Sequence, residues 1–120
     1  MKTISIATFT LHSLFFGTLV LNNAGATDMP PLAKSSQCTA CHKIDKRLLG
    51  PSWMDVSKKY KDATRYVYKD KEYTLEDGLA TKVAKGGSGN WGTMPMPANF
   101  PTVSEADIKE LVKFILSLAK

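Results

Sequence analysis

The sequence is poor in the residues that most often form covalent cross-links and metal sites, because its 120 residues include only two cysteines and two histidines. Cys38 and Cys41 are so close in sequence that a disulfide between them would close a tiny loop and restrain almost none of the unfolded chain. A structural zinc site needs four ligands, and beyond residue 26 His42 is the only histidine that could join these two thiols. These shortages exclude a disulfide scaffold and argue against structural zinc.

Other features that mark common protein classes are also missing. No run beyond residue 26 approaches the length of a membrane span, and we find no internal repeat, low-complexity segment, phosphate-binding loop or nucleophile with a partner base. Lys and Arg outnumber Asp and Glu by 16 to 11, but this mild positive charge comes with no nucleic-acid-binding motif. With 43% hydrophobic and 22% charged residues, the composition is that of one globular domain.

Residues 1–26 have the pattern of a signal peptide. Lys2 precedes a mostly apolar stretch over residues 4–21, and the small residues Ala24-Gly25-Ala26 form a cleavage-like site. An uncleaved membrane anchor is the alternative, although threonines, serines and His12 interrupt the apolar run. Cleavage would leave residues 27–120 as one domain, which we expect in an exported compartment, the periplasm.

The most informative motif is Cys38-Thr39-Ala40-Cys41-His42, a Cys-x-x-Cys-His sequence. On a helical turn, both thiols face the same way and can form thioether bonds to the two vinyl groups of one haem. The next residue, His42, is then placed to ligate the iron. A thioredoxin-like redox pair has the same cysteine spacing, but it expects alternating strands and helices around it. The motif therefore predicts one covalently attached haem c.

A second axial ligand is expected from methionine. The segment 86–97 is rich in Gly and Pro, which predicts an irregular, stiffened loop. Met96 lies between Pro95 and Pro97, which restrict its backbone and would hold its thioether towards iron. Met94 in the same loop is the second choice, and filling a gap in the core is the alternative role for either side chain.

Together these motifs resemble the class I c-type cytochromes of the small bacterial c-551/c-552 type, over essentially all of residues 27–120. The resemblance implies an all-α, compact fold of about four short helices around one haem, with Met96 rather than Met94 as the iron ligand beside His42. The residues that match the family are Cys38–His42, Lys43-Ile44-Asp45, Leu49-Gly50-Pro51, Asp55-Val56, Gly87–Gly92 and Met94–Asn99.

The resemblance also implies roles for residues around the cofactor. The Pro51 carbonyl would accept a hydrogen bond from His42, and the Trp91 indole would donate one to a haem propionate. Lys82 falls where relatives often carry a basic residue near a propionate. The simpler alternatives are a helix-start proline, a core aromatic residue and a solvated lysine.

Four helices are expected, over residues 32–42, 52–60 and 74–86 and from Ser104 onward. The last has an apolar stripe, and the resemblance places Phe114 where the first and last helices cross. Residues 62–73 alternate enough to predict an extended excursion or hairpin. This segment is longer and more aromatic than the family pattern, and its role is either a surface flap over a haem edge or a feature for partner docking.

The leading functional hypothesis is a monomeric electron carrier of a respiratory chain. Eight lysines could surround the haem edge and steer redox partners with acidic docking surfaces, peripheral membrane complexes included, although ordinary solvation explains them equally well: Lys34, Lys43, Lys46, Lys58, Lys59, Lys61, Lys82 and Lys85. Two alternatives stay open. One is a peroxidase-like enzyme or gas sensor with a displaceable sixth ligand, and the other is the cytochrome subunit of a larger oxidoreductase.

Overall fold

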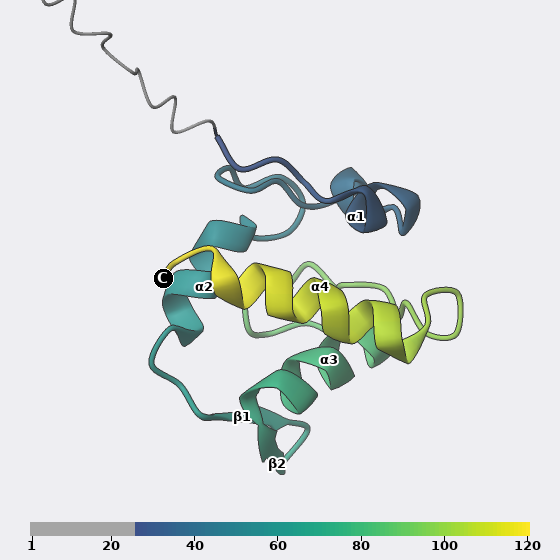
Figure 1. Cartoon of the computed structure of the whole chain (residues 1–120). Helices are drawn as coiled ribbons and strands as arrows, with labels where there is room; N and C mark the ends of the chain where they lie inside the picture. Colours follow the sequence, from purple (N-terminus) through teal and green to yellow (C-terminus); the bar gives the residue numbers. More distant parts are fainter. Residues whose placement is uncertain (1–25) are drawn as a thin grey trace, which may run out of the picture.

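The computed structural model describes residues 26–120 (Figure 1), so the expected signal peptide lies outside the described residues except for Ala26. This part of the chain is predominantly helical, as predicted, with a small antiparallel hairpin of strands β1 (Arg65–Tyr68) and β2 (Lys71–Thr74). No helix within it is long and apolar enough to cross a membrane. The helices are α1 (Pro31–Ser35), α2 (Trp53–Tyr60), α3 (Leu75–Lys85) and α4 (Glu105–Ser117), with a 3-10 turn, η1, over Cys38–Ala40.

Three helices begin where the sequence predicts, because each has a hydroxyl side chain at its N-cap. The oxygens of Ser52, Thr74 and Ser104 accept hydrogen bonds from the backbone N–H groups three residues on, at 3.0, 3.3 and 3.1 Å. Helix α3 also ends as predicted, at Gly86, whose φ of 73° is one that side-chain-bearing residues rarely adopt. These caps set the ends of the helices that surround the candidate site.

The first helix differs from the prediction. The sequence predicts a helix over residues 32–42 that carries the Cys-x-x-Cys-His motif, but α1 ends at Ser35 and Gln37 takes a left-handed conformation, with a φ of 58°. The Ser36 and Gln37 N–H groups close this short helix on the carbonyls of Leu32 and Lys34. Serine is a poor helix former, because its side chain competes for backbone groups. The motif therefore lies on η1, a separate tight turn.

Helix α4 lies between the two halves of the core (Figure 1). On one side, Ile108 and Val112 pack with the hairpin and α3, and on the other Leu111 and Ile115 pack with Ala33 of α1 and with α2. Phe114 is packed at this second contact, in agreement with the expectation that the first and last helices meet there. One helix thus holds the two clusters together.

The segment 62–73 forms the expected hairpin, with Tyr68 paired to Lys71 across a turn in which Lys69 and Asp70 both have positive φ. Tyr66 and Tyr68 point into the core, while Arg65 and Val67 are exposed. Gly78 allows this packing on α3, because a Cβ at that position would lie 2.6 Å from the Tyr66 Cβ. This close packing explains why Gly78, a residue type that is unfavourable inside helices, stands in the middle of α3.

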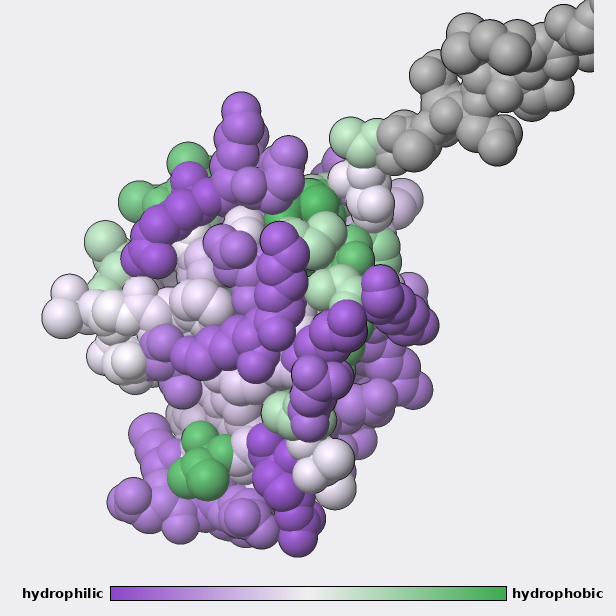
Figure 2. Space-filling view, turned by 90° about the vertical axis from the view of Figure 1, so that its left-hand side faces the viewer, coloured by the Kyte–Doolittle hydropathy of each residue, from purple (hydrophilic) through white to green (hydrophobic). Residues whose placement is uncertain are grey.

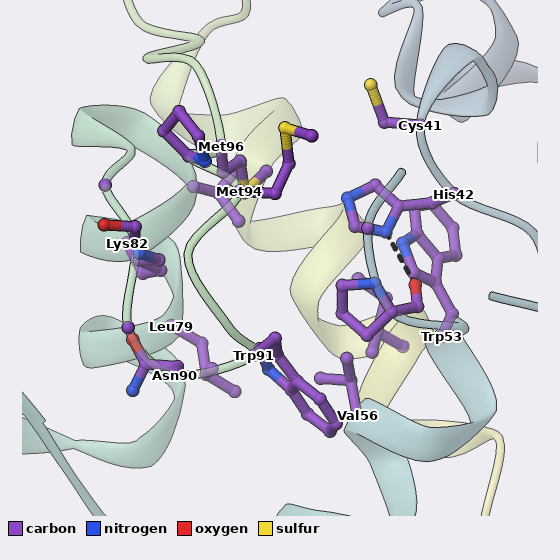
Figure 3. A pocket seen from close by; sticks show the side chains of 18 of the residues that line it. Cys41, His42, Trp53, Val56, Leu79, Lys82, Asn90, Trp91, Met94 and Met96 are labelled. Carbon is purple, nitrogen blue, oxygen red and sulfur yellow. Dashed lines mark hydrogen bonds between the residues drawn. The ribbon is translucent and has the colours of Figure 1, made fainter. Parts of the chain in front are cut away.

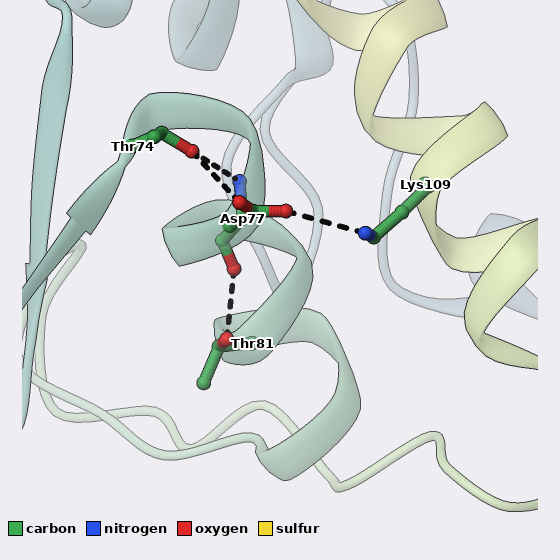
Figure 4. A network of polar contacts seen from close by, with 4 residues as sticks. All are labelled: Thr74, Asp77, Thr81 and Lys109. Atoms are coloured by element: carbon green, nitrogen blue, oxygen red, sulfur yellow. Dashed lines mark hydrogen bonds and ion pairs between the residues drawn. The ribbon is translucent and has the colours of Figure 1, made fainter.

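Helices α3 and α4 are also joined at their surface by a small polar network (Figure 4). The Asp77 carboxylate accepts a hydrogen bond from the Thr74 hydroxyl and pairs with the Lys109 ammonium of α4 at 3.3 Å. These partners, Thr74 first, lower the pKa of Asp77 below its ordinary value. The network ties the start of α3 to α4.

Candidate functional site

The imidazole of His42 is fixed in orientation by one hydrogen bond. Its Nδ1 lies 2.8 Å from the carbonyl oxygen of Pro51, and only 9% of the residue is exposed. Because a carbonyl oxygen can only accept, Nδ1 must be the protonated nitrogen, which leaves the lone pair of the neutral ring on Nε2. Figure 3 shows this second nitrogen on the cavity side of the ring. The side chain is therefore prepared as a metal ligand.

Gly50 forms the surface on which the His42 ring lies. A Cβ at Gly50 would be 2.5 Å from Cε1 and 2.9 Å from Nδ1 of the imidazole, so no larger residue fits without movement. The Gly50 N–H also donates to the Cys41 carbonyl at 2.9 Å, which joins the turn before Pro51 to the cysteine motif. The sequence marked Gly50 only as part of a matching pattern, and the contact supplies its physical reason.

Cys38 and Cys41 are partly exposed and are not joined to each other. The N–H groups of Cys41 and His42 both donate to the Cys38 carbonyl, at 3.1 and 2.9 Å, and so hold the motif in one tight turn. Burial raises the pKa of the Cys38 thiol. In Figure 3 the Cys41 side chain lies beside His42, across the cavity from the two methionines.

The predicted methionine, Met96, lies on the opposite wall from His42 (Figure 3). Its N–H donates to the Gly87 carbonyl at 3.0 Å, and its own carbonyl accepts from the Gly87 N–H at 2.9 Å. Met96 is half-buried, whereas Met94, which also lines the cavity, is 58% exposed. The structure therefore brings both candidate methionines to the cavity and anchors the backbone of Met96.

The Met96 end of this loop approaches the end of α3 very closely. A Cβ at Gly86 would lie 2.3 Å from the Met96 carbonyl oxygen, so only glycine fits there. Further along, the Asn99 side chain donates to the carbonyls of Val83 and Pro97 at 3.0 and 3.1 Å. The end of α3 and the loop of residues 86–97, which we call the methionine loop, are thus packed together as one unit.

Two basic residues that sequence reasoning did not connect with this loop hold its middle. Arg47 donates to the Trp91 carbonyl at 3.1 Å, and Lys59 donates to the Asn90 carbonyl at 3.1 Å. The Lys59 ammonium also lies 4.5 Å from the centre of the Trp91 ring. These bonds end on backbone carbonyls, which leave no residue pattern, so the sequence held no signal for them.

The remaining predicted residues also line the cavity. Pro51, Trp91 and Lys82 are all on its wall. Within residues 26–120 the Trp91 indole N–H has no hydrogen-bond acceptor. The pKa of Lys82 is lowered by burial and, to a smaller extent, by the charge of Lys69.

Sequence reasoning missed Tyr60 and Tyr66, which line the same wall of the cavity. The centres of their rings lie 5.6 Å apart in an edge-to-face arrangement. Burial raises the pKa of both phenols.

The cavity fits a flat, largely apolar cofactor. It measures about 330 Å³ and adjoins a second cavity of about 530 Å³. Both are bordered by the same four residues of the motif and the methionine loop, namely Cys41, His42, Met96 and Pro97. The walls of the first cavity are mainly apolar, and Cys38 and Cys41 lie at the edge that it shares with the second. The donor set is one imidazole nitrogen and one or two thioethers. This is the donor chemistry of a His/Met haem site.

Comparisons with known proteins show which family the chain belongs to. The family described as Cytochrome c matches residues 31–119. Cytochrome c-551 of Azotobacter vinelandii is 43% identical over 86 residues, which cover 72% of this chain and 92% of that protein. Cytochrome c-552 of Nitrosomonas europaea is 40% identical over 118 residues, covering 98% of this chain and 99% of its own length.

A solved structure extends the similarity to three dimensions. The crystal structure of wild-type Nitrosomonas europaea cytochrome c552 superposes with a TM-score of 0.61 at 39% identity, and the match covers 72% of this chain and 95% of that chain. The sequence matches, the fold and the Cys-x-x-Cys-His turn point the same way. The chain therefore belongs to the cytochrome c family, as an electron-transfer protein that binds one haem c covalently through its cysteines.

Proposed function

We propose that this protein carries single electrons between periplasmic redox proteins of a respiratory chain, with His42 and Met96 as the two axial ligands of its haem iron. The observation that carries the proposal is the pairing of His42, whose Nδ1 is taken by Pro51, with Met96 on the opposite cavity wall. The bound haem supplies one iron that changes between the ferric and ferrous states. The residues of the chain would keep the surroundings of this iron the same in both oxidation states.

His42 contributes a ligand whose orientation does not depend on the iron. The Pro51 carbonyl and the backbone of Gly50 hold the ring, so little reorganisation is needed when the iron changes its charge. Hydrogen bonding of Nδ1–H to a carbonyl also makes the other nitrogen more basic. Both effects favour a ligand that stays bound in the two oxidation states.

Met96 contributes a thioether, which raises the reduction potential relative to a second nitrogen ligand. Its neighbours Pro95 and Pro97 restrict the backbone, and two hydrogen bonds join it to Gly87. The largely apolar walls offer water few hydrogen-bond partners on this side of the site. We also propose that the Trp91 indole donates to a haem propionate, as the family resemblance implies.

The surface suits brief encounters with other redox proteins. On the face shown in Figure 2, hydrophilic side chains predominate and the hydrophobic residues form small separate patches. Leu49, on the edge of the cavity, is 53% exposed and lies close in sequence to Lys46 and Arg47. A small apolar edge with positive charge beside it favours fast, weak, salt-sensitive docking of acidic partners by a monomeric carrier.

Export is part of the proposal. We propose that residues 1–26 are removed as a signal peptide, so that the mature protein begins at Thr27. The intact mass of protein matured in a bacterial periplasm checks this. We expect residues 27–120 plus one haem, and a mass that retains residues 1–26 would favour the membrane-anchor alternative.

Optical spectra test the ligation. We would record them for the matured protein, oxidised and reduced, with and without carbon monoxide, and repeat them for Met96→Ala and Met94→Leu. Native protein and Met94→Leu should not bind carbon monoxide, and Met96→Ala should bind it. The matched variants are needed because both methionines line the cavity.

Three other outcomes would each contradict part of the proposed function. Ready binding of carbon monoxide by the native protein would contradict the electron-carrier proposal and favour a gas-binding or peroxidase-like site. Binding by Met94→Leu but not by Met96→Ala would move the axial role to Met94. A stoichiometric partner recovered at low salt would replace the free carrier by a subunit of a larger complex.

A further inference from the structure

The hairpin β1–β2 contains a buried polar contact that the electron-carrier proposal does not use. Tyr68, on β1, is 8% exposed, and its ring packs in the cluster around Leu79, Val103 and Ile108. Its hydroxyl donates a buried hydrogen bond of 3.0 Å to the carbonyl oxygen of Gly86. The hairpin therefore reaches the backbone at the end of α3, immediately before the methionine loop.

The carbonyl that accepts this bond belongs to the same peptide unit as the N–H that holds Met96. The Gly86 carbonyl and the Gly87 N–H lie at opposite edges of one planar group, and that N–H donates to the Met96 carbonyl at 2.9 Å. Because the group is rigid, fixing the direction of its oxygen also fixes the direction of its N–H. Tyr68 and Met96 thus hold the two edges of one peptide.

This peptide needs an anchor from outside its own segment. Gly86 and Gly87 have φ values of 73° and 116°, and neither has a side chain that could restrict rotation of the peptide between them. The close approach of Met96 to Gly86 excludes a Cβ there, so the segment cannot be stiffened by a larger residue. A hydrogen bond from a rigid neighbouring element is the physical alternative.

We propose that Tyr68 is a positioning residue for the axial methionine, acting through the Gly86–Gly87 peptide. Its hydroxyl orients the peptide, the peptide pairs with Met96, and the pairing holds the thioether at the cavity wall. This inference rests on the proposed ligation by Met96. It gives the segment 62–73 a role in the site other than a flap or a docking surface.

Tyr68→Phe tests the proposal in the full haem-containing protein, because it removes only the hydroxyl and keeps the ring that packs in the core. Amide hydrogen exchange should become about tenfold faster at Gly87 and Met96, as expected for a buried carbonyl that loses its donor. Exchange in α4, at Leu111 and Val112, should not change. Imidazole should displace the methionine from the ferric protein about tenfold more readily.

Tyr73→Phe is the matched control. Tyr73 lies on β2 of the same hairpin, and its hydroxyl has no hydrogen-bond partner within residues 26–120. We expect native exchange and native imidazole binding from it. Equal effects of the two variants, unchanged exchange at Gly87 in Tyr68→Phe, or a uniform increase that includes α4 would each overturn the positioning role.

The two readouts separate this inference from the proposed ligation. Backbone exchange reports the Gly87–Met96 pairing whether or not sulfur binds iron. Faster exchange in Tyr68→Phe together with ready carbon monoxide binding by the native protein would support the anchoring of the loop and contradict Met96 as the ligand.

Discussion

Single atoms decide the geometry of the histidine side of the site. The Pro51 carbonyl selects which His42 nitrogen carries the proton, and the missing side chain of Gly50 gives the ring its place. Both residues act by holding the His42 imidazole in one orientation. The effect of a substitution on this orientation can be measured separately from its effect on the stability of the fold.

Gly50→Ala should disturb the ligand ring directly. The new Cβ would overlap Cε1 of His42, and we expect a loss of about 1–3 kcal/mol in the free energy of unfolding, together with altered histidine ligation. Denaturant unfolding and the ferric spectrum of the haem protein measure the two effects.

Gly78→Ala is the matched comparison, because its Cβ would be equally crowded, at 2.6 Å from the Tyr66 Cβ, but its three nearest neighbours all belong to Tyr66 and none to His42. It should change stability and leave the spectrum native. A native spectrum for Gly50→Ala as well would show that the contact at His42 does not control ligation.

The buried phenol of Tyr66 predicts a loss of stability at high pH. Burial, followed by the effect of Tyr60, raises the folded-state pKa of Tyr66 above its ordinary value of 10.0. Below pH 10.0 both the folded and unfolded states keep the proton, whereas above it the unfolded state ionises first and the free energy of unfolding falls.

Tyr66→Phe should remove this component. In urea unfolding at a series of pH values, the variant should lose less stability than the native protein as the pH rises above 10.0. The difference between the two profiles isolates Tyr66, because every other ionisable group is shared by the two proteins. Parallel pH profiles would contradict the assignment.

At the scale of elements, the parts that were predictable from sequence are those with local causes. A hydroxyl residue three positions before an aspartate marks the starts of α2, α3 and α4, and the alternation within residues 62–73 marks the hairpin. The break after α1 depends on a left-handed Gln37, for which the sequence has no strong signal. Contacts that end on backbone carbonyls, such as those of Arg47 and Tyr68, leave no pattern at all.

The Asp77 network between α3 and α4 predicts that the free energy of unfolding falls in acid. The pKa of Asp77 is lowered by Thr74 and Lys109, so its contribution to stability is present above the ordinary pKa of 3.8 and is lost as the pH falls through the lowered value. Asp77→Asn should therefore be less stable than the native protein at neutral pH, and the difference should disappear in acid. Thermal unfolding from pH 7 downward measures it.

Glu76→Gln controls for the loss of one negative charge at the same helix end. Glu76 has no ion-pair partner within residues 26–120, so its effect should be smaller and should respond less to added salt. An equally large effect would mean that the helix dipole, rather than the Asp77 network, is responsible.

For the whole molecule, charge near the cavity edge should govern the rate of encounter with partners. Lys46→Glu and Lys113→Glu change the net charge equally, but Lys46 is close in sequence to Leu49 on the cavity edge and Lys113 is on the exposed face of α4. Electron exchange with a small acidic redox protein should slow several-fold more for Lys46→Glu at low salt.

The two variants should then converge as the ionic strength rises, because salt screens charges separated by more than about 10 Å at roughly 0.1 M. Stopped-flow kinetics over a salt series measures this. Equal slowing by both substitutions would indicate that net charge, rather than a docking edge, sets the rate.

The place of α4 between the two clusters also bears on how the protein is made. Ile108 and Val112 complete one cluster and Leu111 and Ile115 complete the other, so neither core can close before α4 has left the ribosome. A nascent chain with both cores open exposes the apolar residues of both clusters until synthesis ends. The helix that unites the finished fold thereby also makes its assembly late, because both halves of the core are completed in one step at the end of synthesis.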